Sequence, residues 1–450
     1  MSDESPGGAR AAAVGLAAAL TLVAAAVLVP PLTGWQVWAR AHPAGSVPPL
    51  HALWAPKVGA GTLPAVLIAA AGWWRGPAVA DRLAWGRLLL AAYAAGLAWL
   101  LSLALVDGWA GISRVLGSPD EYLRTAREVR SLGDVHRLLE TYVDRIPFSA
   151  APHNWPIHVA GHPPGMLLFF VLLARLGLGG GLAAGLVVTA VAATTPLAVM
   201  TLLRVLGRER VARSVSAYLV LAPTAVYAAV SADAVMASTV AWGMVALARA
   251  SVRGVHRGWP WAVLAGLLLG AAVMMSYGLL LVGLLALVVV ALRRAWWVLP
   301  VGGGAALVVV LAFAALGFAW WQAYPVLVDR YWDGLAHKRP GGYWIWADLA
   351  ALLLSVGPAV GAGLGAGWQA MCARPRGDRV VAALVGAGVA MVALADLSQM
   401  SRAEVERIWL PFAPWLILAL AFLSVRWRRP ALAVQVLTAL VVEHLLYTTW

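Results

Sequence analysis

Apolar runs of about 15 to 24 residues recur from one end of the chain to the other. They constrain the fold more than any other feature, because backbone N–H and C=O groups in hydrocarbon must be paired within the segment, which favours helices. Only 12% of the 450 residues are charged, about half the share found in soluble domains. We therefore predict an all-α, polytopic transmembrane protein that forms a single integral-membrane domain over residues 1–450.

Hydropathy together with flanking arginines predicts thirteen spans. They are 11–32, 60–74, 88–106, 181–204, 214–231, 234–250, 260–275, 277–293, 296–318, 347–366, 379–395, 408–424 and 430–448. The segment 165–178 is apolar but short and contains Arg175, so we predict a re-entrant or juxtamembrane helix there.

Charge predicts the orientation of this scheme. The segments assigned to the cytoplasm carry 19 basic and five acidic residues, whereas the outer segments carry 13 basic and 14 acidic residues. The positive-inside rule then predicts a multi-pass protein of the plasma membrane, with a cytoplasmic N-terminus and extracytoplasmic loops at 107–180 and 319–346. The net charge of +13 is spread over short clusters at span ends, so nucleic acid is not expected as a partner. The single cysteine, Cys372, lies in a predicted cytoplasmic loop and should be a free thiol.

The loop 107–180 contains the longest polar stretch of the chain, and an acid pair, Asp120-Glu121, opens it. A helix is expected over 120–128, and acidic residues in a first turn commonly serve as N-caps. Alternatively, one carboxylate acts as a general base toward an acceptor hydroxyl. Its neighbour would then hold the acceptor or a divalent cation, although the sequence requires no cofactor and predicts no metal site.

The same stretch closes with His162-Pro163-Pro164-Gly165, immediately before the short apolar segment. Two prolines fix φ and suit the first turn of a helix, so a rigid turn is one interpretation. The other is a functional histidine, held near the acid pair, that donates a hydrogen bond to a phosphate.

Further polar residues lie in three other outer segments. The segment 320–348 contains Lys338, Arg339 and Tyr343, and the segment 396–407 contains Arg402 and Arg407. A lone acid, Asp233, falls in a tight predicted turn and is expected to be only a loop residue.

An Asp-Glu pair in the first large outer loop, followed about 40 residues later by His-Pro-Pro before a short apolar helix, resembles the C-type glycosyltransferases. These include protein O-mannosyltransferases and lipid A aminoarabinose transferases. The segment Ala403–Phe412, AEVERIWLPF, is also similar to one in actinobacterial membrane proteins of this type. The chain departs from the family pattern in the two extra predicted spans before the acid-bearing loop.

The resemblance implies transfer of a sugar, such as mannose, from a polyprenyl-phosphate donor to an extracytoplasmic glycan, lipid or protein acceptor of the cell envelope. It assigns Asp120 as the catalytic base and Glu121 as its assistant, and it places His162 where many members have a phosphate-contacting lysine. A phosphate also requires fixed cations. The expected substrate-binding set is therefore His162, Lys338, Arg339, Tyr343, Arg402 and Arg407.

Alternatives remain open. Arg407 could be an interface anchor, or it could pair locally with Glu404 and Glu406. A polytopic lipid or solute transporter is the rival function, because charged residues deep in spans mark transport paths. In the predicted spans only Glu443-His444 fits that description, so the polar outer loops favour the enzyme.

Overall fold

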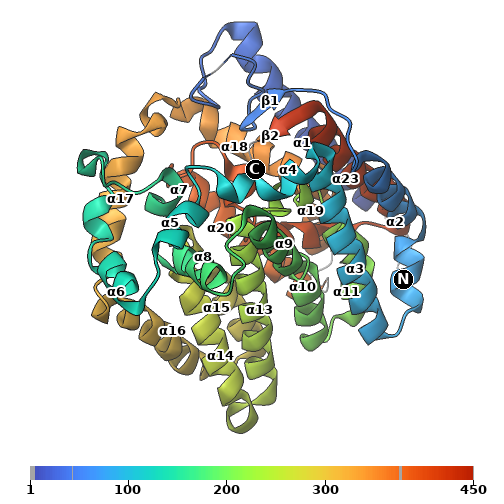
Figure 1. Cartoon of the computed structure of the whole chain (residues 1–450). Helices are drawn as coiled ribbons and strands as arrows, with labels where there is room; N and C mark the ends of the chain where they lie inside the picture. The colour runs from blue at the N-terminus through green and yellow to red at the C-terminus, as the bar shows by residue number, and fades with distance from the viewer. Residues whose placement is uncertain (1–5, 43, 374–377, 449–450) are drawn as a thin grey trace.

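The computed structural model describes residues 6–42, 44–373 and 378–448 (Figure 1). The chain is almost entirely helical, as expected from its composition. Within the described residues, the sheet structure is one antiparallel pair in which β1 (Ala52–Trp54) is paired with β2 (Leu446–Thr448). This pairing joins the segment after the first helix to the C-terminal end of the last one.

Most of the longer helices follow one another through short turns. The longer helices are α1 (Pro6–Thr33), α2 (Thr62–Arg82), α3 (Trp85–Ala104), α9 (Gly181–Ala192), α10 (Thr195–Val205), α11 (Glu209–Val220), α13 (Ala232–Arg253), α14 (Val255–Val273), α15 (Val282–Arg293), α16 (Val298–Ala315), α17 (Trp320–Asp333), α18 (Gly341–Val356), α19 (Ala359–Ala373), α20 (Arg379–Leu397) and α23 (Val425–Leu445). Longer segments separate α1 from α2, α3 from α9 and α20 from α23.

Six helices in the described part of the chain are long and apolar enough to cross a membrane. They are Gly7–Thr33, Trp85–Asp107, Gly181–Val205, Ala232–Arg253, Val298–Ala315 and Arg379–Leu397. The pair α18–α19 would make a seventh if its two halves form one span. These helices fit a helical membrane protein, but the prediction of thirteen spans is wrong.

Three predicted spans show why the count was too high. The predicted span 347–366 bends by 101° between α18 and α19, where Gly357 has φ +88° and Pro358 follows. The predicted span 214–231 ends its helix at Val220, before Pro223, and continues only as the single turn α12 (Ala225–Ala228). The predicted span 408–424 is divided between short helices that include α22 (Ala413–Ile417). Proline and glycine in these segments end the helices that hydropathy alone joins.

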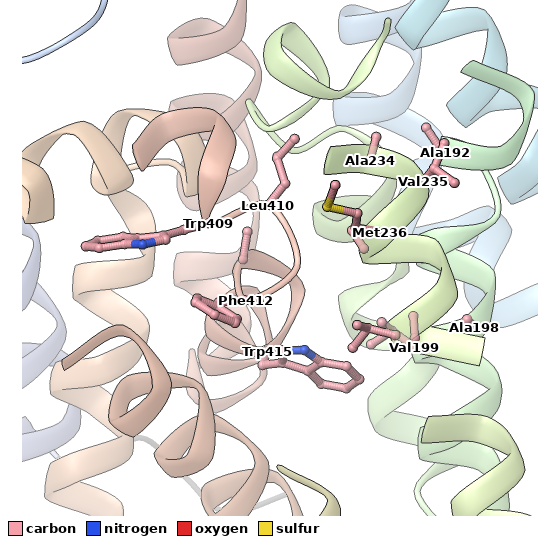
Figure 2. Packing of buried hydrophobic residues seen from close by; sticks show 14 of the residues in the cluster. Ala192, Ala198, Val199, Ala234, Val235, Met236, Trp409, Leu410, Phe412 and Trp415 are labelled. Atoms are coloured by element: carbon pink, nitrogen blue, oxygen red, sulfur yellow. The ribbon is translucent and has the colours of Figure 1, made fainter. Parts of the chain in front are cut away.

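Apolar sequence in this protein also serves to bury helices against one another. In the most apolar 18-residue stretch of α13, 78% of the residues are buried, whereas 11% are buried in the corresponding stretch of α16. Figure 2 shows Leu410 next to Met236 of α13, and Trp415 of α22 next to Val199 of α10. The segment after residue 404 therefore packs beside the beginning of α13.

The loop 107–180 folds into short helices rather than spans. They include α4 (Trp109–Ser113), α5 (Tyr122–Glu128), α6 (Leu132–Glu140), α7 (Ile157–Ala160) and α8 (Gly165–Arg175). The predicted short apolar helix is confirmed as α8, which packs on α5 (Figure 1). At its start the Gly165 N–H donates to the Met274 carbonyl at 2.7 Å, and a β-carbon at this glycine would collide with that carbonyl. The glycine after the two prolines thus lets α8 dock against the end of α14.

Candidate functional site

Segments far apart in the sequence bring six ionisable side chains into one buried region, which we call the charged cluster. Three come from the loop 107–180, one from the first turn of α13, and two from the turn around α21 (Val405–Ile408). The members are Glu121, His158, His162, Asp233, Glu404 and Arg407.

Glu121 is the best-placed carboxylate of the cluster. It occupies the N-cap position of α5, yet its side chain makes no capping hydrogen bond. Instead its Oε1 accepts from Nδ1 of His158 at 2.7 Å, and the residue is only 4% exposed. Its other oxygen, Oε2, is buried and has no hydrogen-bond partner in the described part of the chain. The capping interpretation is therefore wrong for Glu121, and Oε2 remains available to a ligand.

Glu121 and His158 form an ion pair. Burial by itself raises the pKa of Glu121, but the charge and hydrogen bond of His158 outweigh it, and the pKa is lowered. Burial lowers the pKa of His158, but Glu121 outweighs this effect and the pKa is raised. Both directions favour the charged forms of the pair.

His162 is in a different protonation state. Its Nδ1 lies 2.8 Å from the His158 carbonyl oxygen and 2.9 Å from the Tyr122 hydroxyl. Since a carbonyl can only accept, Nδ1 carries the proton, and Nε2 of the neutral ring has a lone pair. Burial lowers the pKa of His162, which favours this neutral form. The geometry suits His162 to accepting a proton or hydrogen bond better than to donating one to a phosphate.

The two histidines are held by their surroundings. The Tyr142 hydroxyl donates to the Val159 carbonyl at 2.8 Å, and Trp155 Nε1 donates to the Tyr142 carbonyl at 2.8 Å. From α17, Arg330 donates to the Trp155 carbonyl at 2.9 Å and also to the Ile146 carbonyl. Helix α17 thus supports the turn that presents His158 and His162.

Asp233 and Arg407 form the most deeply buried ion pair of the cluster. Arg407 Nη1 lies 2.6 Å from Asp233 Oδ2, and the residues are 4% and 2% exposed. Burial lowers the pKa of Arg407, but the carboxylates of Asp233 and Glu121 outweigh it, and the pKa is raised. The expectation that Asp233 is only a loop residue is wrong. Of the two local acids considered as partners of Arg407, Glu404 contributes to its raised pKa, whereas Glu406 Oε1 accepts from the His51 backbone N–H at 2.8 Å.

Arg339 adjoins the cluster through Glu404. Its Nη2 donates to Glu404 Oε1 at 3.0 Å, and its Nε donates to the Trp38 carbonyl at 3.1 Å. The Arg339 guanidinium also donates to the Arg402 carbonyl. In return, Nη1 of Arg402 donates to the Arg339 carbonyl at 2.6 Å. These arginines tie three segments together, so much of their donor capacity is directed at the protein.

Besides Arg339 and Arg402, three residues expected at the site are not members of the charged cluster. The side chain of Asp120 is exposed, while its carbonyl accepts from the His158 N–H at 3.1 Å. Lys338 is exposed, with its Nζ 5.1 Å from the centre of the Trp38 ring. Tyr343 is fully buried and its hydroxyl donates to the Ala26 carbonyl of α1 at 2.8 Å.

The sequence-based interpretation missed His158 and underestimated Asp233. The four-residue spacing of His158 and His162 was a usable signal, because residues four apart on a helical turn face the same way. No comparable signal existed for Asp233, whose partner Arg407 is 174 positions away.

Among the described residues, no three His, Cys, Asp or Glu side chains are grouped so that they could hold a metal ion. Comparison with known proteins finds no matching family model, no matching curated protein and no matching solved structure.

The Glu121–His158 pair predicts a pH-dependent stability. The pKa of Glu121 lies below its ordinary 4.5, so ionised Glu121 stabilises the fold above about pH 4.5. The pKa of His158 lies above its ordinary 6.5, so protonated His158 stabilises the fold below about pH 6.5, and this effect is lost as the pH rises through the raised pKa. The contribution of the pair is therefore largest at about pH 4.5 to 6.5 and is lost as His158 deprotonates. We expect the midpoint of thermal unfolding, followed by tryptophan fluorescence, to fall between about pH 6 and pH 8.5.

The variant His158→Gln should show a smaller fall, because it removes the titrating partner. His136→Gln is the matched control, since His136 forms an exposed ion pair with Glu140. An equal fall in the native protein and in His158→Gln would contradict a charged Glu121–His158 pair.

Proposed function

We propose that the protein transfers a sugar from a polyprenyl-phosphate-sugar donor to an acceptor hydroxyl on the extracytoplasmic face of the membrane. One observation carries this proposal: Glu121 is buried with one oxygen held by His158 and the other without a partner in the described chain. An unsatisfied buried carboxylate oxygen is costly, so its retention points to a group that arrives with a ligand. A hydroxyl donor satisfies it.

The proposed reaction is a single displacement at the anomeric carbon. The acceptor oxygen forms the new bond to that carbon while the bond to the phosphate oxygen breaks, and polyprenyl phosphate leaves with the electron pair. Glu121 Oε2 takes the proton of the acceptor hydroxyl. His158 holds the Glu121 carboxylate in place through Nδ1, and neutral His162 provides a second acceptor nearby.

Family resemblance alone assigns the base to Asp120. The exposed position of the Asp120 side chain favours its neighbour Glu121 instead, because a base must lie within hydrogen-bond reach of a positioned hydroxyl. The Asp120 side chain then takes no part in the reaction. Its backbone carbonyl accepts from the His158 N–H and holds the helical turn that carries His158.

An apolar gap beside the charged cluster is compatible with a lipid-linked donor. It has a volume of about 60 Å³, and its lining includes Ala234, next to Asp233, and Leu410, three residues after Arg407. The gap is lined mainly by apolar side chains, so it offers contact to the apolar part of a lipid-linked donor next to the ionisable groups of the cluster. This combination fits an amphiphilic substrate.

The proposal is tested by a transfer assay in membranes that contain the full-length protein. Radiolabelled polyprenyl-phosphate mannose and polyprenyl-phosphate arabinose are supplied separately, and label in the membrane acceptor fraction is counted. We expect transfer from one of them above the level of membranes without the protein. Equal labelling with and without the protein, for both donors, would argue against transfer of these sugars.

A transporter remains the alternative because Asp233 and Arg407 form a buried ion pair at the end of the candidate span α13. Charged groups in such positions mark transport paths in other membrane proteins. Protein-dependent movement of labelled lipid across liposomes, without a change in its chemical identity, would favour this function over transfer.

A further inference from the structure

A second polar site lies at the opposite end of α5 from Glu121. It is a hollow of about 510 Å³ whose lining includes Arg127, Arg130 and Arg175. Ala174, Gly177, Gly179 and Gly180 form the other wall, where α8 ends. Six residues separate Glu121 from Arg127, so a rise of 1.5 Å per residue places their backbones about 9 Å apart along the helix.

The three arginines have donors to spare. Arg127 uses Nε for the Gly179 carbonyl at 2.8 Å, and Arg175 uses Nη1 for the Arg130 carbonyl at 2.7 Å. Each guanidinium has five N–H donors. The Arg130 side chain makes no hydrogen bond or ion pair with the described part of the chain, and none of the three forms an ion pair with a carboxylate there. The nearest acid in sequence, Glu128, is exposed and forms no ion pair with these arginines in the described part of the chain. Asp134 accepts from the backbone N–H groups of Arg130 and Ser131.

This situation contrasts with the charged cluster. There Arg407 faces Asp233, and Arg339 faces Glu404, so each cation already has an anionic partner. An added phosphate would meet carboxylates in that cluster, whereas in the hollow it would meet three arginines. Uncompensated arginines in a concave site select an anion, and their forked geometry suits phosphate oxygens.

Apolar side chains beside the hollow indicate what carries the phosphate. Leu172 and Leu176 are 55% and 64% exposed, and Leu178 and Leu182 are also exposed. They belong to α8, to the turn after it and to the start of α9, the first part of a candidate membrane span. Exposed leucines next to arginines are typical of a protein surface at the boundary between lipid headgroups and acyl chains.

We propose that Arg127, Arg130 and Arg175 bind the phosphate of an anionic membrane lipid, with the neighbouring leucines against its acyl chains. The site is distinct from the charged cluster and does not depend on the glycosyl-transfer proposal. Along α5, the backbone of Arg127 lies about 9 Å from that of Glu121.

The test measures lipid binding by the purified full-length protein in a neutral detergent, with native mass spectrometry to count bound molecules. Short-chain phosphatidylglycerol is the anionic probe, short-chain phosphatidylcholine is the zwitterionic probe, and inorganic phosphate is the lipid-free probe. We expect one saturable phosphatidylglycerol site, and about tenfold weaker binding in Arg130→Ala. Arg130→Lys should recover part of the affinity because it keeps the charge.

Arg124→Ala is the matched control, because Arg124 is an exposed arginine on the same helix outside the lining of the hollow. It should bind phosphatidylglycerol as the native protein does. Equal affinity in the native protein and in Arg130→Ala, or equal affinity for the two lipids, would overturn the site. Inorganic phosphate binding as tightly as phosphatidylglycerol would overturn the assignment to a lipid. Because the readout is binding, failure of this proposal leaves the transfer assay unaffected.

Discussion

The variant Glu121→Gln is expected to lower the rate of sugar transfer by at least about a hundredfold. Gln keeps the size of the side chain and can still accept from His158, but it cannot take a proton from an acceptor hydroxyl. General base catalysis contributes about 10²- to 10⁴-fold in rate. The measurement is the initial rate of label transfer in membranes with matched amounts of folded protein, checked by size-exclusion chromatography.

Asp120→Asn is the control for this prediction, since Asp120 is the adjacent carboxylate with an exposed side chain. Its transfer rate should stay within about threefold of native, because surface substitutions away from a site have small effects. The reverse result, with Asp120→Asn inactive and Glu121→Gln active, would restore the role that family resemblance assigns to Asp120. Full activity in both variants would remove the acid pair from the mechanism.

Among the proposed single variants, Asp233→Ala should give the largest loss of folding stability. It leaves Arg407 buried beside an empty position, and removing one partner of a buried ion pair costs about 3–5 kcal/mol. We expect a lower midpoint of thermal unfolding and a smaller monodisperse fraction after purification. Transfer activity should fall with the amount of folded protein.

Two further variants identify the cause. The double variant Asp233→Leu with Arg407→Met removes both charges, and replacement of a buried pair by apolar residues is often neutral, so stability should largely return. Breaking the exposed pair of His136 and Glu140 by His136→Ala should cost less than about 1 kcal/mol. A double variant as unstable as Asp233→Ala would show that lost packing, rather than an unpaired charge, causes the effect.

Local features of the fold were predictable because their causes are local. The short helix expected at 165–178 is present at Gly165–Arg175, where prolines precede it and Gly177, with φ +80°, follows it. The helix expected over 120–128 is present at Tyr122–Glu128. The span count failed because hydropathy cannot separate a helix that faces lipid from one that faces other helices. The mostly buried α13 and the mostly exposed α16 are both strongly apolar.

The candidate site was predictable in part. The polar loop drew attention to Glu121 and His162, which are conspicuous between apolar segments and which the structure brings into the charged cluster. The division of roles was not predictable, because Asp120 and Glu121 are adjacent and only the backbone decides which side chain points inward. Glu121 has φ −94° and ψ 177°, an extended conformation, and its carboxylate reaches His158.

By itself the sequence determined the helical, membrane-compatible class of this protein, since the apolar content of each segment is a property of that segment alone. It also determined which loops carry charge. Only the tertiary structure decided which charges meet: Glu121 with His158, Asp233 with Arg407, and Arg339 with Glu404. The physical reason is that an ion pair depends on distance in space, and the partners here lie 37, 174 and 65 positions apart along the chain.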